Sequence, residues 1–179
     1  MTVDALRIEQ ISSAAAVGPA LRQELLACWI AVTNAGGAAG FPFPPVDSQQ
    51  VAPVLDALVR TLAPDTSRLV TAHLGPRLVG WLHLRRDLSP LVAHWGTVHH
   101  VQTHPGVQGR GIGTALMHEA HRSARDGMGL EQLHLAARGG AGLETFYARL
   151  GWREVGRGPA ALRLGPGADR DEILLFRRL

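Results

Sequence analysis

The sequence predicts one α/β domain in which seven strands and four helices share 179 residues. Apolar residues recur at helical spacing in some segments and alternate with polar residues in others, which predicts helices and strands respectively. No repeat and no linker-like stretch divides the chain, and its length suits a single domain. With 46% hydrophobic and only 18% charged residues, the composition excludes a disordered chain. We therefore expect residues 1–179 to fold as one domain.

The N-terminal part is expected to form one strand and two helices. Alternation of side-chain character predicts the strand over Ala5–Ile11. Apolar residues at helical spacing between Leu21 and Val32 predict the first helix. The glycines and prolines of Asn34–Pro45 cannot continue it, and a second amphipathic helix is expected to start near Asp47.

The middle of the chain is expected to be mainly sheet. Two strands, Arg68–Leu74 and Leu78–Arg86, are joined at Gly75–Pro76, a sequence typical of a hairpin turn. A longer strand is predicted over Val92–Thr103.

Helices and strands alternate again in the C-terminal part. A helix is predicted over Gly111–Arg125, a strand over Leu130–Ala136 and a short helix over Leu143–Leu150. Two closing strands, Arg153–Arg157 and Glu172–Arg178, flank a loop rich in glycine and proline. The order of elements is thus β-α-α-β-β-β-α-β-α-β-β.

The kinds of charged and sulfur-bearing residues exclude several classes of site. The chain contains no lysine, which excludes a Schiff-base enzyme and a GxxxxGK phosphate loop. Cys28 is the only cysteine, so an internal disulfide and a multi-cysteine metal site are excluded, and a reducing cytoplasm is expected. The arginines are scattered and the net charge is only +3, which argues against nucleic acid as a partner. The N-terminus lacks the features of a signal peptide, no apolar run is long enough for a membrane span, and no membrane partner is expected.

A glycine-rich turn lies between a predicted strand and a predicted helix, at Gln108–Thr114. It does not match the dinucleotide pattern GxGxxG, because Thr114 stands where the last glycine would be. Its glycines allow close approach of a ligand, and the free N–H groups at the start of a helix favour a phosphate or pyrophosphate. An ordinary strand-to-helix turn would show the same glycines, so this reading needs the wider context.

That context is a resemblance to a known family. The run Val101–Met117 resembles motif A of the GNAT superfamily of N-acetyltransferases, and Phe146–Trp152 resembles its motif B. Both occur in the family's order and spacing. The resemblance implies a central mixed, mostly antiparallel twisted sheet of about seven strands flanked by four helices. The glycine-rich pattern at Gly36–Phe41 is also similar to that of tabtoxin-resistance acetyltransferases.

The same resemblance implies acetyl-CoA as the co-substrate. Its pyrophosphate would be held by backbone amides of Gly109–Thr114, and its pantetheine arm would pair with Val101–Thr103, where the family's central strands separate. One position departs from the family: Gly140 stands where many relatives have an asparagine that contacts this arm. The residues expected to bind the cofactor are Val101, Gln102, Thr103, Gln108, Gly109, Arg110, Gly111, Ile112, Gly113, Thr114 and Tyr147.

Tyr147 is the candidate general acid. It is the only tyrosine of the chain, and the resemblance places it where the family has its proton donor to the departing thiolate. Its neighbours Leu143, Phe146 and Leu150 also fit a core aromatic on an amphipathic helix, and the sequence alone leaves both roles open.

His99 and His100 are the candidate bases for removing the proton of an amine. Alternation along a regular strand would put His99 and Val101 on one face and His100 on the other, unless a bulge intervenes. We expect His99 to act, with an ordinary histidine pKa, and the resemblance implies the Val101 amide as oxyanion donor. A sheet histidine without catalytic role, or a metal site formed with His104, are the alternatives; no metal is expected.

Together these features predict an acetyl-CoA-dependent N-acetyltransferase. The expected acceptor is the primary amine of a small molecule, amino-acid-like or antibiotic-like, attacking directly in a ternary complex. The alternatives are acetylation of a protein N-terminus or lysine, and a non-catalytic acyl-CoA-binding domain. The oligomeric state, a homodimer included, is left open by the sequence.

Overall fold

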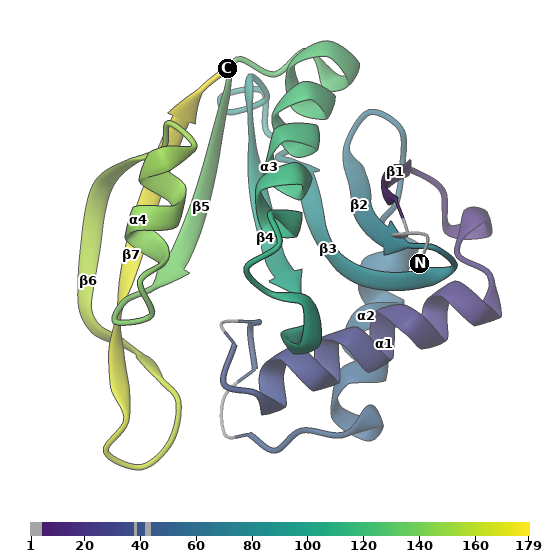
Figure 1. The fold of residues 1–179 in the computed structure, drawn as a ribbon. Coiled ribbons are helices and arrows are strands. Elements are labelled where there is room, and N and C mark those ends of the chain that lie inside the picture. Colours follow the sequence, from purple (N-terminus) through teal and green to yellow (C-terminus); the bar gives the residue numbers. More distant parts are fainter. Residues whose placement is uncertain (1–4, 38, 42–43) are drawn as a thin grey trace.

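Among residues 5–37, 39–41 and 44–179, which the computed structural model describes, seven strands form one sheet in the order β1-β2-β3-β4-β5-β7-β6 (Figure 1). The strands are β1 (Leu6–Ile11), β2 (Ser67–Leu74), β3 (Arg77–Arg86), β4 (Trp95–Thr103), β5 (Gln132–Arg138), β6 (Arg153–Arg163) and β7 (Asp169–Arg178). The α-helices are α1 (Pro19–Asn34), α2 (Ser48–Arg60), α3 (Ile112–Arg122) and α4 (Leu143–Arg149). All neighbouring strands run antiparallel except β4 and β5. The fold predicted from the sequence is confirmed.

The parallel pair β4 and β5 stays together only near the start of both strands. Their register ends at the pair Thr97 and His134, although β4 continues to Thr103 and β5 to Arg138. Figure 1 shows the two strands diverging from there on. The part of β4 after Thr97 therefore has no β5 partner, and its edge faces an opening in the sheet.

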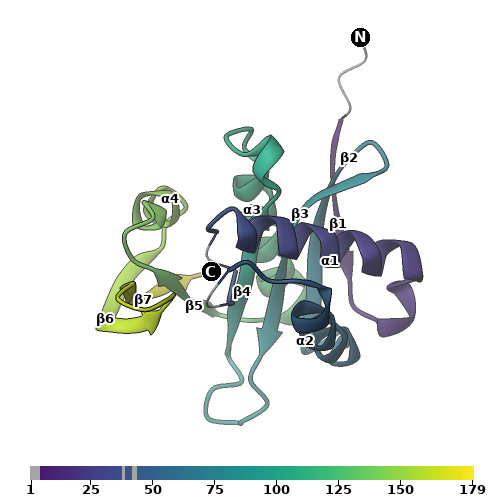
Figure 2. The same cartoon turned by 90° about the horizontal axis from the view of Figure 1, so that it is seen from below.

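The helices cover the two faces of the sheet unequally. Helices α3 and α4 pack on one face, where Leu116, Tyr147 and Leu135 belong to one buried cluster. Helices α1 and α2 share a second cluster that includes Trp29 and Trp81. Figure 2 shows α2 on the side of the sheet opposite to α3, with α1 crossing the end of the strands. We call these the α3 side and the α1 side.

Local sequence signals set the ends of α1 and α2. Asp47 caps α2, accepting hydrogen bonds from the backbone N–H groups of Gln49 and Gln50, so this helix starts where the sequence predicts. Helix α1 ends at Asn34, as predicted for a chain that continues into Gly36. The Asn34 side chain then accepts a hydrogen bond from the Val46 N–H, 2.7 Å, and donates one to the Val46 carbonyl, 3.0 Å. These two bonds close the segment between Asn34 and Val46 at its base.

Several predicted boundaries are wrong by a few residues. The strand expected over Val92–Thr103 begins at Trp95, because backbone bonds from Val92 to Ser89 and from Trp95 to Val92 form turns instead. The helix expected over Gly111–Arg125, with its end near Gly127, does end there, but it changes from α-helix to π-helix over Ser123–Gly127.

The strands of the C-terminal part differ more from their predicted bounds. The strand expected over Leu130–Ala136 lies at Gln132–Arg138. Strand β6 ends later than predicted, at Arg163, and β7 begins earlier, at Asp169. The glycine- and proline-rich stretch thus forms most of a long hairpin. Strand β6 is at the edge of the sheet and its register shifts between Gly158 and Leu162, which is how an edge strand accommodates Pro159.

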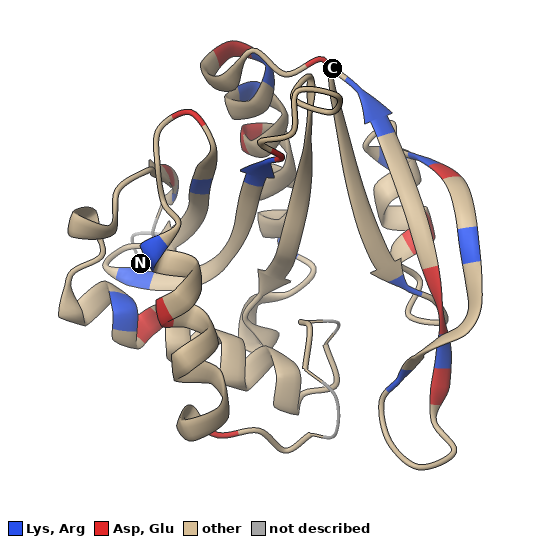
Figure 3. Cartoon of the chain, turned by 180° about the vertical axis from the view of Figure 1, so that it is seen from behind, with Lys and Arg blue, Asp and Glu red and all other residues tan. Residues whose placement is uncertain are grey.

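Charged side chains on the hairpin form pairs instead of a stripe of one sign. Arg157 lies 2.9 Å from Glu154 and 3.2 Å from Asp171, and Arg163 lies 2.8 Å from Asp169. Figure 3 shows blue and red segments interspersed along β6 and β7. Within the part of the chain that the structure describes, no helix combines the length and apolarity needed to span a membrane.

Candidate active site

A cavity of about 970 Å³ opens where β4 and β5 separate. Six structural parts line it: the end of α1 with the following loop, β4, the glycine-rich turn with the start of α3, the end of β5, α4, and the tip of the β6–β7 hairpin. The cavity therefore reaches from the α3 side to the α1 side through the opening in the sheet.

The glycine-rich turn presents unpaired backbone donors to the α3 side of the cavity. Gly109 and Gly111 have φ values of +77°, a left-handed conformation that side-chain-bearing residues rarely adopt. Gly111 is the N-cap of α3, so the N–H groups of Ile112, Gly113 and Thr114 point out of the first helical turn without intrahelical partners. Such amides, together with the positive end of the helix dipole, favour a phosphate or pyrophosphate.

Other features of this side fit the pantetheine arm of acetyl-CoA. Val101, Gln102 and Thr103 line the cavity along the unpaired edge of β4, where an extended ligand can pair like an added strand. A Cβ on Gly113 would come within 3.4 Å of the Phe146 ring, so α3 and α4 approach closely here. Arg110 is exposed and does not line the cavity.

The two histidines of β4 do not follow the predicted alternation. His99 is the register partner of His83, but the next pair joins Gln102 to Trp81. Three steps on β4 thus match two on β3, which is a bulge at His100 and Val101. His100 has a φ of +54°. The expectation that His99 and Val101 share a face is therefore wrong.

The bulge puts both histidine rings on the α1 side. The His100 ring lies 5.9 Å from that of His99 and 4.7 Å from that of Trp29, whereas Val101 packs against the buried cluster of the α3 side. His100 lines the cavity and His99 does not. Regular alternation fails here because the extra residue reverses the facing of every position after it.

The surroundings of His100 keep its imidazole neutral. Burial and, to a smaller extent, the neighbouring His99 lower its pKa to about 4, although a hydrogen bond with the Ala39 backbone partly opposes both effects. A Cβ on Gly40 would lie 3.2 Å from its Cε1 atom, so the ring is enclosed by the loop after α1. At neutral pH this side chain has a free nitrogen lone pair and can accept a proton.

Behind His99 a hydrogen-bond chain holds a third histidine, His83. The Thr61 hydroxyl donates to the Leu58 carbonyl, 2.7 Å, and lies 3.1 Å from the Ser67 hydroxyl. Ser67 Oγ lies 2.8 Å from His83 Nε2. Because Thr61 donates to Leu58, Ser67 must donate to Thr61 and accept from His83, which fixes the proton of this ring on Nε2. Burial lowers the pKa of His83 to about 3.

Tyr147 lies on α4 and lines the side of the cavity opposite to His100. Only 5% of its surface is exposed, and its ring packs edge-on against those of Phe146 and Trp152 at 5.0 and 6.1 Å. Burial raises its pKa, so the phenol is protonated throughout the physiological range and can act as a hydrogen donor. Both interpretations of this residue, core aromatic and cavity donor, agree with its position.

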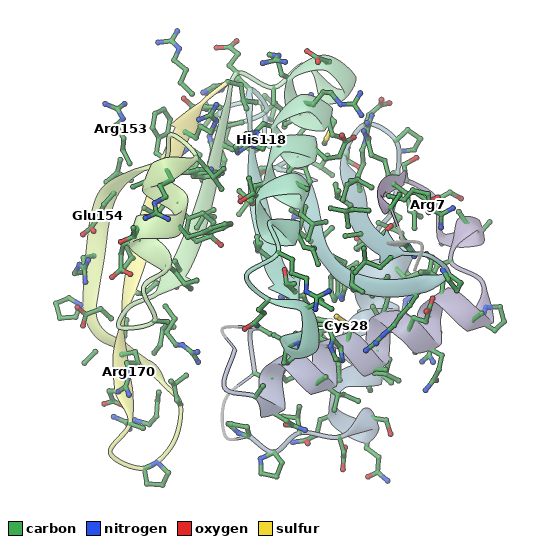
Figure 4. All side chains as sticks on the ribbon, viewed as in Figure 1. Arg7, Cys28, His118, Arg153, Glu154 and Arg170 are labelled. Carbon is green, nitrogen blue, oxygen red and sulfur yellow. The ribbon has the colours of Figure 1, made fainter. Side chains whose placement is uncertain are left out.

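His104 and Cys28 take no part in the cavity lining. His104 Nδ1 accepts a hydrogen bond from the Gly106 N–H, 3.2 Å, at the turn before the glycines. The described residues contain no group of three or more His, Cys, Asp or Glu side chains arranged to hold a metal ion. Cys28 is buried on α1 (Figure 4), and burial raises the pKa of its thiol to about 12.

Three charged side chains at the cavity were missed by sequence reasoning: Arg138, Arg163 and Glu172. Arg138 and Glu172 face each other in the register of β5 and β7 and both line the cavity. The predicted strand ended at Ala136, so Arg138 fell outside it. If the predicted strand had been two residues longer, alternation would have placed Arg138 on the other face of the sheet from Leu135 and Ala137.

Comparison with known proteins agrees with this architecture. Residues 65–154, just over half of the chain, match the family model described as acetyltransferase (GNAT) domain. A search of curated proteins returns no match.

Solved structures show the same fold at low sequence identity. A GNAT-family acetyltransferase from Streptococcus pneumoniae is 17% identical, with a TM-score of 0.74 over 98% of this chain and 100% of its own. A ribosomal-protein-alanine N-acetyltransferase from Brucella melitensis is 19% identical, with a TM-score of 0.73 over 97% and 99%. The yncA protein of Salmonella typhimurium, solved with its cofactor acetyl-CoA, is 16% identical, with a TM-score of 0.69 over 98% and 94%.

Proposed function

The chain belongs to the GNAT acetyltransferase family, and on this basis we propose that it transfers the acetyl group of acetyl-CoA to the primary amine of a small molecule. We further infer that residues 1–179 act as one N-acetyltransferase domain. The observation that carries the proposal is the continuous cavity, which joins the free amides of α3 to Tyr147 and His100. When bound, acetyl-CoA supplies an acetyl group activated as a thioester.

The size of the cavity favours a small acceptor over a protein. Its volume of about 970 Å³ is within the range of small-molecule pockets, and the cofactor arm must occupy part of it. The loop after α1 and the tip of the β6–β7 hairpin both line the cavity, so the acceptor would be enclosed between them.

His100 is proposed as the base. It lines the cavity, whereas His99 lies outside it, and its neutral ring can take the proton that the amine loses as the new C–N bond forms. Its low pKa makes it a weak base toward a free ammonium ion. The step therefore suits a neutral amine whose nitrogen becomes acidic only on attack.

Tyr147 is proposed as the acid. Its phenol stays protonated because burial raises its pKa, and it would donate a proton to the sulfur as the C–S bond breaks. Cys28 supports direct attack by the amine. This thiol is buried away from the cavity, and its raised pKa disfavours the thiolate that an acyl-enzyme intermediate would need.

The proposal is tested by incubating the purified protein with acetyl-CoA and a panel of primary amines. We expect release of free thiol and an acetylated product by mass spectrometry. The Tyr147→Phe variant keeps the ring and is expected to lower kcat by about 10²–10⁴-fold with little change in acetyl-CoA affinity. Absence of thiol release with every amine would refute the proposal, and a normal rate for Tyr147→Phe would remove the acid role.

A further inference from the structure

The charged residues that line the cavity are few. Among its described lining residues only Arg138, Arg163 and Glu172 carry a formal charge at neutral pH. Arg163 is already paired with Asp169, with Nε to Oδ1 and Nη2 to Oδ2 distances of 2.8 Å each. Because both of these bonds go to one carboxylate, the Arg163 guanidinium already has an anionic partner.

Arg138 lies on the α1 side of the cavity. Leu135 and Ala137 of β5 belong to the buried cluster of the α3 side, so the alternating position of Arg138 points the other way. Its Nη2 donates a hydrogen bond to the carbonyl of Gly36, in the loop after α1. This contact reaches across the opening between β5 and α1.

Arg138 has no carboxylate partner within the part of the chain that the structure describes. Its guanidinium instead donates a hydrogen bond to the Gly36 carbonyl. Glu172 stands opposite to it in the strand register, but no nitrogen–oxygen contact of 4.0 Å or less joins the two side chains. Burial lowers the pKa of Arg138, and the nearby Arg170, on the lower part of β7 in Figure 4, lowers it further. A partly buried cation beside a second cation is unfavourable until an anion joins it.

We propose that Arg138 binds a carboxylate of the acceptor, so that the molecule acetylated is an amine that also carries a carboxylate. This inference rests on the proposed function and narrows its substrate class. The unused N–H groups of a guanidinium form a planar fork that matches a carboxylate.

The loop after α1 contacts both Arg138 and His100, and its length limits how far apart they lie. Arg138 bonds to Gly36 and the His100 ring packs against Gly40, and these two glycines are four residues apart. Their backbones are therefore separated by at most about 14 Å even if the chain were fully extended. An amine at His100 and a carboxylate at Arg138 can thus belong to one α- or ω-amino carboxylic acid.

The test uses pairs of acceptors that differ only in the carboxylate: amino acids, together with ω-amino carboxylic acids of increasing length, and their primary amides. For at least one pair, wild-type protein should acetylate the acid with a kcat/KM about 10- to 100-fold above that of the amide. Arg138→Gln should abolish this preference by raising the KM for the acid, with the KM for acetyl-CoA unchanged. Arg138→Lys should keep part of the preference, because it keeps the charge but not the fork.

Arg163→Gln is the matched control, since this arginine lines the same cavity but already has a carboxylate partner. It should keep the wild-type ratio of acid to amide, and thermal unfolding of each variant checks that it is folded. Equal use of acids and amides by wild-type protein, acetylation of simple amines alone, or an equal loss for both acceptors in Arg138→Gln would overturn the inference. None of these outcomes contradicts the proposed function, which is refuted only if no amine at all is acetylated.

Discussion

The two sides of the cavity are built from different parts of the polypeptide. On the α3 side the chain offers mainly backbone: the first amides of α3 and the unpaired edge of β4. On the α1 side it offers side chains, among them His100 and Arg138. Backbone donors are set by the fold and are the same for any residue but proline. Side-chain groups depend on individual positions and can change without altering the fold.

This difference teaches where the specificity of the enzyme lies. A cofactor shared by a whole family is suited to a site made of backbone, whereas an acceptor that differs between members needs a site made of side chains. Substitutions should therefore act in opposite ways on the two sides. On the α3 side, cofactor affinity should respond mainly to changes of backbone conformation, with Tyr147 acting on the chemical step, and on the α1 side single polar groups should decide which acceptor is used.

The largest effect is expected on the α1 side, from His100. His100→Gln keeps a polar side chain but removes the proton acceptor, and kcat should fall by about 10²–10⁴-fold. His99→Gln is the control, because that ring lies outside the cavity. Steady-state kinetics at saturating acetyl-CoA measures both. A greater loss in His99→Gln than in His100→Gln would reverse the assignment and return the base role to His99.

A smaller effect is expected on the α3 side from a change of backbone. Gly111 has a φ of +77°, and a β-branched residue is strained there. Nothing lies within 4 Å of an added Cβ, so Gly111→Val should disturb the conformation of the turn without a steric clash. We expect affinity for CoA to fall by about 10- to 100-fold, or about 1.4 to 2.7 kcal/mol, in a protein that still folds. Unchanged affinity in calorimetry would show that the turn does not hold the pyrophosphate.

The buried histidines of both sides predict a pH dependence of stability. The pKa is lowered to about 3 for His83 and to about 4 for His100 and His121. The unfolded chain therefore binds more protons than the folded one between about pH 6.5 and 4, so stability is lost as the pH falls through that window. His83→Asn should reduce the slope of the unfolding free energy by about 1.4 kcal/mol per pH unit.

Denaturant unfolding at several pH values between 6.5 and 4.5 measures this slope. The exposed Gln49 carries no titrating group and provides the control variant, Gln49→Ala, which should keep the wild-type slope. An identical slope in His83→Asn and wild type would mean that His83 titrates normally in the folded protein.

The smallest effect is expected from Arg110. Its side chain is exposed and outside the cavity lining, so Arg110→Ala should weaken CoA binding only about two- to threefold, through a loss of long-range attraction that salt screens. Comparing its CoA affinity at low and high ionic strength with that of wild type measures this. A loss as large as that of Gly111→Val would mean that a side chain, and not the backbone, holds the phosphates.

The parts of the fold that local signals determine could be predicted from the sequence. Asp47 marks the start of α2, Gly75 and Pro76 form the turn between β2 and β3, and Gly111 precedes α3. Each is fixed by the conformational or capping preference of a few adjacent residues. The glycine-rich turn beside the cavity was predictable for the same reason, whereas its expected role in binding acetyl-CoA came from the family resemblance.

The α1 side was less predictable because it depends on pairing between distant segments. Whether His99 or His100 faces the cavity is decided by a register shift between β3 and β4, which neither strand shows alone. Arg138 lines the cavity because β5 pairs with β7 for two residues beyond its predicted end. Burial then gives both histidines low pKa values that their sequence does not indicate.

The paired hydrogen bonds between Asn34 and Val46 have an evolutionary and practical consequence. They join the two ends of the segment that borders the cavity without using the residues between those ends. The entropy of closing a loop changes slowly with its length, so this segment can be shortened, lengthened or exchanged while α1 and α2 keep their places. Exchanging this segment between two enzymes is therefore a direct way to transfer the acceptor preference of one to the other.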